Sequence, residues 1–529
     1  MTGLPFAGFE WDTPSRFNFA VDVVDYWAEN GNSLALIWEN DKGDERRFTY
    51  GEISTLSKRL AHGLRQQGVQ KGDFVLVVLP RIPEWQIAIT ALMRIGAVPV
   101  PCIEMLRASD IAYRADHCGA RAVICRAGHV AQINAGLDSV PVRFSVGAHP
   151  GWHSVDATLA QTQEVEAADI RAEDPAILYY TSGSTGNPKG VLHASRTIHA
   201  WRNSARYWLD VHPGDRIWCT ADTGWSKAGT STLFGPWAQG GTAFFYDGPF
   251  EAKSRLRLLE KHKITIYCAA GTELFRVVQE DVNSFDISAL RRTVTAGEAM
   301  NTAVADAWFD ATGMRVAEAY GQTETLMTLL TLVGLDPRVG SMGVAAPGVK
   351  MAVLDDKGRG LPDGETGNIA IRLPNPQMML DYLHAPEKRA QSIVRNEAGE
   401  WFLTGDLGRR DADGFYWYEG RSDDIISSAG YRIGPTEVEN ALASHPAVLE
   451  CAAVAAPDRE RGQVVKAFIV LKPGHGPSDT LSRDIQDHVK AATAPYKYPR
   501  QIEYRNELPK GVTGKILRRA LREEAKTND

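Results

Sequence analysis

Short apolar runs alternate with helical patterns through the first half of this chain, and this alternation leaves few folds open. Residues 73–80 (DFVLVVLP) have the composition of a buried strand, residues 84–97 (EWQIAITALMRIGA) have helical periodicity, and residues 98–102 (VPVPC) favour a strand again. This order is that of a βαβ unit, whose two strands pair in parallel. The sequence therefore predicts an α/β fold built on parallel-rich sheets covered by helices.

Further apolar runs repeat the pattern, and each ends in a loop of Gly, Ser or Thr. They are residues 121–126, 176–180, 216–221, 242–247, 264–270 and 290–297. Ligands of open α/β sheets bind beyond the carboxyl ends of the strands. We therefore expect these loops to surround the functional site.

The pattern changes twice toward the end of the chain. After about residue 350, short strands with turn signals, such as residues 355–367, predict a β-rich subdomain. The last hundred residues then begin a new series of helix and strand patterns, enough for a small α+β domain. We predict a large N-terminal domain over residues 1–421 and a small C-terminal domain over 422–529.

Composition excludes several classes of protein. With 529 residues and a net charge of −7, the chain has no basic field of the kind that nucleic acid binding requires. Its apolar runs are shorter than a membrane span, and its first residues lack a basic-then-apolar leader, which favours a cytoplasmic protein without a membrane span. Six scattered cysteines without a CxxC pattern indicate reduced, buried thiols rather than a zinc site.

The segment YYTSGSTGNPKG, residues 179–190, is the clearest sign of chemistry. Its glycines let backbone N–H groups approach a polyphosphate, its hydroxyls donate hydrogen bonds, and its lysine neutralises charge. It is not a Walker loop, because Gly rather than Ser or Thr follows the lysine. The residues expected on the phosphates are Thr181, Ser182, Gly183, Ser184, Thr185, Gly186 and Lys189.

This loop resembles the phosphate loop TSGSTGxPKG of the adenylate-forming superfamily, which includes acyl-CoA synthetases, luciferases and nonribosomal adenylation domains. Motifs at residues 297–300, 318–325, 402–442 and 508–522 follow in the family's order, and the wording AGYRIGPTEVENAL, VVKAF, APYKYPR and VTGK is similar to that of medium-chain acyl-CoA synthetases. The resemblance implies an enzyme that activates a carboxylic acid with ATP and Mg²⁺ as an acyl-adenylate, releases pyrophosphate, and transfers the acyl group to coenzyme A.

The resemblance also assigns the nucleotide site, which makes the N-terminal domain the AMP-binding one. Thr323 is expected on the α-phosphate and Glu324 on Mg²⁺, although a Thr-Glu pair standing alone would indicate a helix cap. Asp406 is expected on the ribose hydroxyls, where a turn residue is the plain alternative, with Arg421 beside it. Adenine is expected against Gly297, Glu298, Ala299, Ala319 and Tyr320.

Lys515, in the VTGK motif, is the residue that the resemblance implies for the first half-reaction. A carboxylate that attacks the α-phosphate brings two anions together, so a mobile cation stabilises the transition state electrostatically. The same lysine is a candidate for acetylation by a lysine acetyltransferase, which would switch the enzyme off.

Thioester formation requires a different arrangement, and the family achieves it by rotating a mobile C-terminal domain. The resemblance places the hinge at Asp423. Gly430 would leave room for the pantetheine arm of coenzyme A. The further candidates for coenzyme A are Tyr431, Arg432, Arg461 and Tyr498, and for Arg461 an ordinary surface arginine is an equal alternative.

Three residues bear on the acid. Gly321 stands where acetate-specific relatives carry a Trp, which leaves space for several carbons. Trp225 is expected to form an apolar wall or to be a core tryptophan, and Lys227 to pair with a buried acid or to meet a polar acyl tail. Short- to medium-chain, branched and aromatic acids all fit this pattern.

Four other functions compete with this interpretation. An enzyme that loads a carrier protein shares the ATP motifs, but the GYRIG loop and the absence of a carrier segment favour coenzyme A. A luciferase-like oxygenase shares the fold. A regulator without catalysis would be expected to lack Lys515 or Glu324, and a serine hydrolase would need a GxSxG elbow, which the sequence does not contain.

Overall fold

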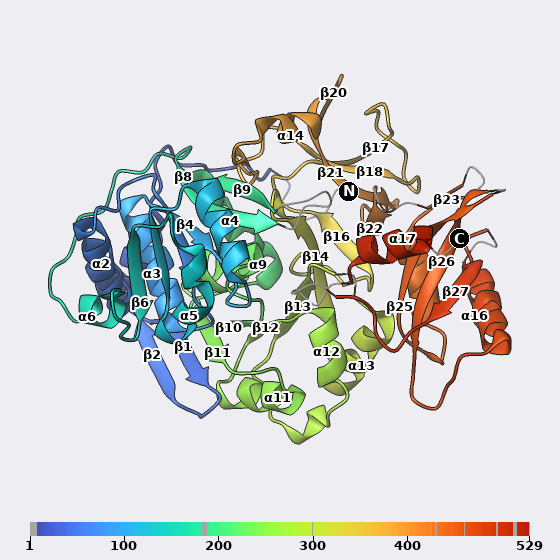
Figure 1. Cartoon of the computed structure of the whole chain (residues 1–529), viewed down its shortest axis with the longest axis horizontal. Coiled ribbons are helices and arrows are strands. Elements are labelled where there is room, and N and C mark those ends of the chain that lie inside the picture. The colour runs from blue at the N-terminus through green and yellow to red at the C-terminus, as the bar shows by residue number, and fades with distance from the viewer. Residues whose placement is uncertain are drawn as a thin grey trace. The chain divides into compact units, whose positions relative to one another are not determined.

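The computed structural model describes residues 8–181, 188–298, 300–422, 424, 426–428, 431–459, 461–493, 496–510 and 516–527 (Figure 1). Its contacts divide the chain into two compact units. The first contains Met1–Lys350 and Leu373–Gln391, and the second contains Met351–Arg372 and Ser392–Asp529. The chain therefore passes between the units three times.

One sheet of the first unit is entirely parallel. It contains β3 (Phe74–Val78), β4 (Val98–Pro101), β5 (Ala122–Arg126), β6 (Val142–Val146) and β7 (His153–Ser154) in the order β4-β3-β5-β6-β7. Helix α3 (Pro83–Ile95) connects β3 to β4, as the sequence predicts, and is buried along its whole length. It begins at Pro83 and ends at Ile95, and the following Gly96 has a φ of 74°, which suits glycine.

The second sheet of this unit carries most of the predicted site. Its parallel strands are β14 (Val316–Gln322), β13 (Arg292–Ala296), β12 (Ile266–Cys268), β10 (Arg216–Cys219), β11 (Thr242–Asp247) and β1 (Leu34–Asn40), in that order. Antiparallel strands β15 (Leu326–Leu330) and β16 (Ser341–Ala345) follow β14, and β2 (Glu45–Thr49) pairs with β1. Apolar side chains of α11 (Ala252–Lys261), α12 (Gly271–Val277) and α13 (Thr302–Thr312) pack on this sheet.

A small third sheet holds the phosphate-loop segment. Strands β8 (Pro175–Thr181) and β9 (Lys189–Ala194) form an antiparallel hairpin, and β19 (Asp381–Tyr382) pairs with the free edge of β9. Strand β19 belongs to the segment 373–391, in which the chain returns to the first unit. The sequence pattern did not predict this third strand.

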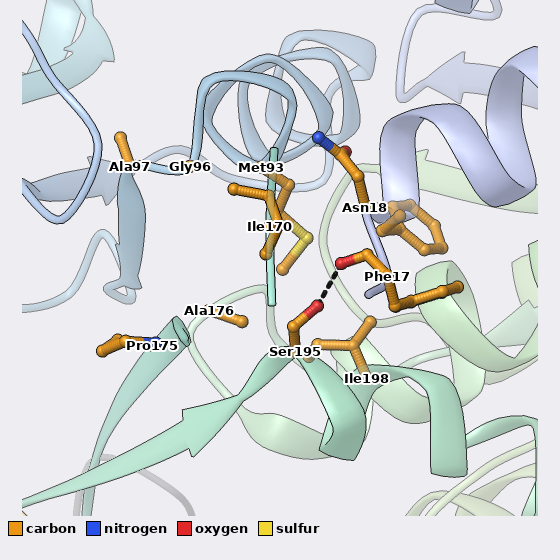
Figure 2. Close-up of a pocket in the computed structure, with 11 residues that line it drawn as sticks. Phe17, Asn18, Met93, Gly96, Ala97, Ile170, Pro175, Ala176, Ser195 and Ile198 are labelled. Carbon is orange, nitrogen blue, oxygen red and sulfur yellow. Dashed lines mark hydrogen bonds between the residues drawn. The ribbon is translucent and has the colours of Figure 1, made fainter. Parts of the chain in front are cut away.

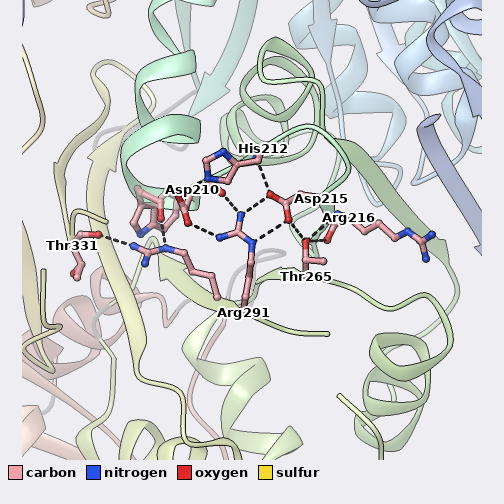
Figure 3. A network of polar contacts seen from close by, with 9 residues as sticks. Asp210, His212, Asp215, Arg216, Thr265, Arg291 and Thr331 are labelled. Atoms are coloured by element: carbon pink, nitrogen blue, oxygen red, sulfur yellow. Dashed lines mark hydrogen bonds and ion pairs between the residues drawn. The ribbon is translucent and has the colours of Figure 1, made fainter. Parts of the chain in front are cut away.

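A network of charges ties together the amino ends of three parallel strands (Figure 3). Arg291 contacts Asp210 and Asp215 with N–O distances of 2.5 Å, and Thr265 donates a hydrogen bond of 2.7 Å to Asp215. Asp215, Thr265 and Arg291 directly precede β10, β12 and β13. Because ligand loops lie at the opposite, carboxyl ends of such strands, we assign this network to the fold.

The second unit begins with an antiparallel sheet. It contains β17 (Met351–Leu354), β18 (Gly367–Arg372), β20 (Ile393–Asn396), β21 (Gly399–Arg410) and β22 (Tyr416–Arg421), and it matches the predicted β-rich segment. A second sheet follows, with β23 (Ile426–Ser428), β24 (Tyr431–Ile433), β25 (Val448–Asp458), β26 (Gly462–Leu471) and β27 (Gln501–Tyr504).

Three helices accompany that second sheet, as an α+β unit requires. They are α15 (Pro435–Ala443), α16 (Asp479–Ala492) and α17 (Arg518–Thr527). Val438, Leu442, Ile485 and Val489 of α15 and α16 share its apolar core. The predicted α/β fold class with a smaller C-terminal domain is confirmed. The division at 421/422 stays a prediction, because its hinge at Asp423 lies outside the described residues.

Within the part of the chain that the structure describes, no helix combines the length and the apolar composition that crossing a membrane requires.

Candidate active site

The phosphate-loop hairpin presents Lys189 beside Tyr382. Thr181, the last residue of β8, pairs with Lys189, the first residue of β9. The predicted phosphate ligands Ser182, Gly183, Ser184, Thr185 and Gly186 lie outside the described residues. The Lys189 ammonium lies 5.4 Å from the centre of the Tyr382 ring, a cation–π contact.

The same tyrosine links this hairpin to the predicted metal ligand. The Tyr382 hydroxyl donates a hydrogen bond of 2.9 Å to Glu324 Oε1, and the Met379 N–H donates one of 2.9 Å to the Glu324 carbonyl. The Thr323 hydroxyl lies 3.4 Å from that of Ser226. The structure thus brings Lys189, Thr323 and Glu324 to one place.

His193 holds this turn from β9 and was not predicted from the sequence. It is fully buried, and burial lowers the pKa of its imidazole to about 3. The neutral ring lies with Nε2 2.8 Å from the Thr323 carbonyl oxygen. Because a carbonyl oxygen only accepts, Nε2 must carry the hydrogen. One feature of the sequence could have indicated His193: side chains alternate between the two faces of a strand, so His193 lies on the same face of β9 as Lys189.

The predicted adenine residues meet at two neighbouring strand ends. Gly297 and Glu298 directly follow β13, and Ala319 on β14 pairs with Ala296 at the end of β13. Glu298 Oε1 accepts a hydrogen bond of 2.8 Å from the Thr272 N–H. Tyr320 follows Ala319, and Ala299 lies outside the described residues.

Two acyl-pocket candidates, Trp225 and Lys227, lie in the segment that follows β10. Trp225 precedes the short helix α9 (Ser226–Ala228) and packs against the apolar cluster of the all-parallel sheet. Lys227 donates a hydrogen bond of 2.8 Å to the Ala296 carbonyl. Among the described residues it forms no ion pair, so a buried acid partner for Lys227 is not seen.

Gly321, the third candidate, is confined by backbone. A Cβ atom placed on it would lie 1.8 Å from the Leu326 carbonyl oxygen, beside an irregularity in the β14–β15 pairing. The close approach of the two strands therefore gives a reason for glycine here that is independent of the acyl chain.

In the second unit, Asp406 and Arg421 face each other on β21 and β22. Asp406 is buried, and Arg421 Nη1 lies 3.3 Å from its Oδ1. The Asp406 N–H donates a hydrogen bond to the Thr404 hydroxyl, which fixes the turn at Gly405. The two predicted ribose residues thus form one preorganised pair.

Of the coenzyme A candidates, Arg461 lies near the hairpin that contains Tyr431 and Arg432, whereas Tyr498 makes other contacts. Arg461 precedes Gly462, which pairs with Ser428 of the hairpin β23–β24 that contains Tyr431 and Arg432. The side chains of Tyr431 and Arg432, and all of Gly430, lie outside the described structure. Tyr498 instead contacts Arg500, whose Nη1 donates a hydrogen bond of 2.9 Å to its hydroxyl, and Lys490.

Lys515 also lies outside the described residues, and only the residues on either side of 511–515 are described. Lys510 and Ile516 form an antiparallel bridge, and the Leu517 N–H donates to the Pro509 carbonyl. Arg522 of α17 forms an ion pair of 2.6 Å with Asp424, next to the predicted hinge.

A separate cavity of about 20 Å³ lies between the N-terminal segment, α3 and β8 (Figure 2). Phe17, Met93, Ile170 and Ile198 line it, and the Ser195 hydroxyl points to the Phe17 carbonyl. This volume has room for about one water molecule, so it is too small for an acyl chain.

Comparison with known proteins agrees with this geometry. The AMP-binding enzyme family model matches residues 24–383, and the AMP-binding enzyme C-terminal domain model matches residues 437–515. Acyl-coenzyme A synthetase ACSM5, mitochondrial, of Homo sapiens is 40% identical over 531 residues, which cover 97% of this chain and 91% of that protein.

Solved structures show the same likeness. The anthranilate CoA ligase AuaEII, in complex with anthranoyl-AMP, has a TM-score of 0.87 and 33% identity over 98% of both chains. A benzoate CoA ligase from Burkholderia xenovorans LB400 has a TM-score of 0.84 and 28% identity, over 96% of this chain and all of that one.

The chain therefore belongs to the AMP-binding enzyme family, the adenylate-forming enzymes. Within that family it is an AMP-forming acyl-CoA synthetase, for which an acid, ATP and coenzyme A are the substrates, and it is similar to the medium-chain acyl-CoA synthetases.

Proposed function

We propose that this acyl-CoA synthetase activates short- to medium-chain carboxylic acids, with branched and aromatic acids included. The observation that supports the proposed nucleotide site is the contact of Tyr382 with both Lys189 and Glu324, because it joins a cation to the carboxylate that follows Thr323. Such a set binds the phosphates of a nucleotide together with a divalent cation.

In the first half-reaction, each of the predicted site residues is proposed to contact one part of the nucleotide. Lys189 and the residues of loop 181–186 hold the outer phosphates, and Thr323 holds the α-phosphate. The Asp406–Arg421 pair binds the ribose, and the strand ends at Gly297 and Ala319 bind adenine. Tyr320 provides a face for the base.

Mg²⁺ is part of this proposal. Glu324 is a carboxylate that is oriented by the Tyr382 hydroxyl, which is the donor set that a hard cation prefers. When bound, Mg²⁺ would neutralise charge on the phosphates, and Glu324 would hold it next to Thr323.

The second half-reaction uses the mobile C-terminal domain, with Asp423 as hinge. Lys515 acts in adenylation, and rotation of the domain then moves it away from the acyl-adenylate. The same rotation brings the hairpin that contains Gly430, Tyr431 and Arg432 to the acyl group, where it binds coenzyme A. The position of Arg461 beside the strand partner of this hairpin supports its role with coenzyme A. Tyr498 keeps a weaker role, because its hydroxyl already accepts from Arg500.

The acyl pocket is proposed at Trp225, Lys227 and Gly321. The substrates named for AuaEII and for the benzoate ligase are aromatic, which supports acids of that class here. Because Lys227 has no ion-pair partner among the described residues, its ammonium favours acids with a polar acceptor on the acyl chain.

Two finer predictions remain proposals. A cytoplasmic location would be tested by fractionation, since the name of ACSM5 gives a mitochondrial location for that relative. Acetylation of Lys515 by an acetyltransferase would be tested by mass spectrometry of the protein from its native cells.

The test is a panel of acids. Purified protein with MgATP and coenzyme A would receive acetate, butyrate, octanoate, isobutyrate, 2-methylbutyrate, benzoate or a hydroxy acid of matched length, and AMP and acyl-CoA would be measured by mass spectrometry. We expect equal amounts of both products, with acids of four or more carbons preferred over acetate. A preference for acetate would contradict the proposed pocket.

Glu324→Gln provides the matched control, because it keeps the size of the side chain and removes the carboxylate. We expect this variant to form no AMP above background with any acid. AMP without a thioester in the wild type would instead indicate a carrier protein as the acceptor.

A further inference from the structure

Two cysteines end neighbouring parallel strands beside the candidate active site. Cys219 is the last residue of β10, Cys268 is the last residue of β12, and the two are paired in register. Both are fully buried. Residues paired in this way direct their side chains to the same face of a sheet.

The backbone spacing suits a covalent link. Neighbouring strands lie about 4.8 Å apart, and disulfides join Cα atoms that are roughly 4.4–6.8 Å apart. Because a link directly across two strands lies at the short end of that range, it would be strained, and strained disulfides are reduced easily.

The surroundings activate one of the two thiols. Interaction with the Cys268 thiol, together with the charge of Lys227, holds the pKa of Cys219 below its usual value despite burial. The same interaction and burial raise the pKa of Cys268. Burial lowers the pKa of Lys227, but the two sulfurs together with Glu298 and Glu273 raise that pKa overall.

The other cysteines of the chain differ from this pair. Burial raises the pKa of Cys102, Cys118, Cys125 and Cys451. Cys102 and Cys118 share the apolar cluster of the all-parallel sheet, where they offer a second, non-activated pair for comparison.

We propose that Cys219 and Cys268 are a redox modification site, which hydrogen peroxide converts to an intramolecular disulfide and a dithiol reductant restores. The Cys219 thiol loses its proton, the thiolate attacks one peroxide oxygen, the O–O bond breaks, and the leaving hydroxide takes up that proton, so that a sulfenic acid and one water form. The Cys268 thiol then attacks the Cys219 sulfur, the S–S bond forms, the S–O bond breaks, and the leaving hydroxide takes the Cys268 proton and departs as a second water. Two thiols are oxidised while one peroxide is reduced to two waters. In reducing compartments such disulfides are transient and regulatory.

Oxidation would reach the substrate site through Lys227, and this consequence rests on the proposed placement of adenine and acid. Lys227 bonds the Ala296 carbonyl at the end of β13, and the predicted adenine residues Gly297 and Glu298 follow directly. Drawing the two sulfurs together changes the position of Lys227 and of this strand end. A displacement of this kind is expected to lower acyl-CoA formation about tenfold.

The experiment compares the wild type with Cys219→Ser, Cys268→Ser and the control variants Cys102→Ser and Cys118→Ser. Each protein would be treated with hydrogen peroxide, blocked with an alkylating agent and digested without reduction, and joined peptides would be identified by mass spectrometry. Because neither thiol is exposed, we expect a slow reaction. The wild type and both control variants should join the peptides of Cys219 and Cys268 and lose activity until dithiothreitol is added.

The peptide link is measured independently of activity, so it tests the site even if the proposed substrate is wrong. A wild type without the Cys219–Cys268 link, or a reversible loss of activity that persists in both Cys219→Ser and Cys268→Ser, overturns the proposal. Alanine variants at the same two positions repeat the test if the serine variants do not fold.

Discussion

At the scale of single residues, His193 holds the backbone of Thr323, the residue that we propose binds the α-phosphate. Its Nε2–H bonds the Thr323 carbonyl, and its pKa is too low for protonation under working conditions. We expect His193→Ala to lower adenylate formation roughly 10–100-fold, because Thr323 moves relative to the α-phosphate. His193→Gln, whose amide reaches a similar position, should recover part of the rate. Pyrophosphate exchange measures both, and equal losses in the two variants at unchanged melting temperature would contradict a positioning role.

Tyr382 acts in a similar way on Glu324. Removal of its hydroxyl in Tyr382→Phe leaves the ring beside Lys189 but frees the carboxylate. We expect the Mg²⁺ concentration for half-maximal activity to rise about tenfold, as is typical when a residue that orients a metal ligand is lost. A Mg²⁺ titration of the two proteins at saturating ATP measures this. An unchanged Mg²⁺ requirement with a lower kcat would show that Tyr382 serves Lys189 instead.

Glu318 makes the stability of the first unit depend on pH. It is buried on β14 and accepts hydrogen bonds from the N–H groups of Gly340 and Met300, but burial dominates and raises its pKa to about 7. A carboxyl with a raised folded-state pKa stabilises the fold below its unfolded value, and this contribution is lost as the pH rises through about 7.

The expected loss between pH 5 and pH 8 is on the order of 1–3 kcal/mol. Glu318→Gln cannot ionise, so its melting temperature should fall less over that interval than that of the wild type. Parallel melting curves for both proteins would contradict the assignment.

At the scale of elements, the β14–β15 hairpin explains why Gly321 is glycine. An added Cβ would meet the Leu326 carbonyl at 1.8 Å, so Gly321→Ala must move backbone that also positions Thr323. We expect a loss of about 1–3 kcal/mol in the free energy of unfolding together with lower adenylation activity. Urea denaturation and pyrophosphate exchange measure the two effects. Gly128→Ala, where a Cβ meets open space, is the matched control and should change neither.

Elements also show how far the sequence alone leads. The βαβ unit around α3, the strands that end at the site and the β-rich segment after residue 350 were all predicted, because continuous apolar runs mark buried strands. Strand β19 was missed, since two residues carry no periodicity. The alternation of β9 puts His193 on the face of Lys189, but the contacts that His193 and Tyr382 make join segments far apart in the chain, and such contacts leave no local pattern.

At the scale of the whole molecule, the two half-reactions should be separable. Lys515→Ala removes the proposed cation of adenylation, so we expect a loss of about a hundredfold or more in adenylate formation. Thioester formation from supplied acyl-adenylate and coenzyme A should remain near the wild-type rate. Lys510→Ala is the control, because Lys510 forms an ion pair with Glu450 at 2.7 Å and has no proposed role. Equal losses in both half-reactions would refute the division of roles.

The path of the chain between its two units determines where this protein can be joined to a related one in a chimera. Segment 373–391 returns to the first unit to add β19 to the strands that flank the phosphate loop. In a chimera joined near residue 350, the relative would supply β19 and the residue at position 382. That strand would then have to pair with β9 of this chain, and that residue would have to orient Glu324. A junction after Gln391 keeps the native strand with its partners, so it should transfer a C-terminal domain while leaving Glu324, the proposed metal ligand, in its native contacts.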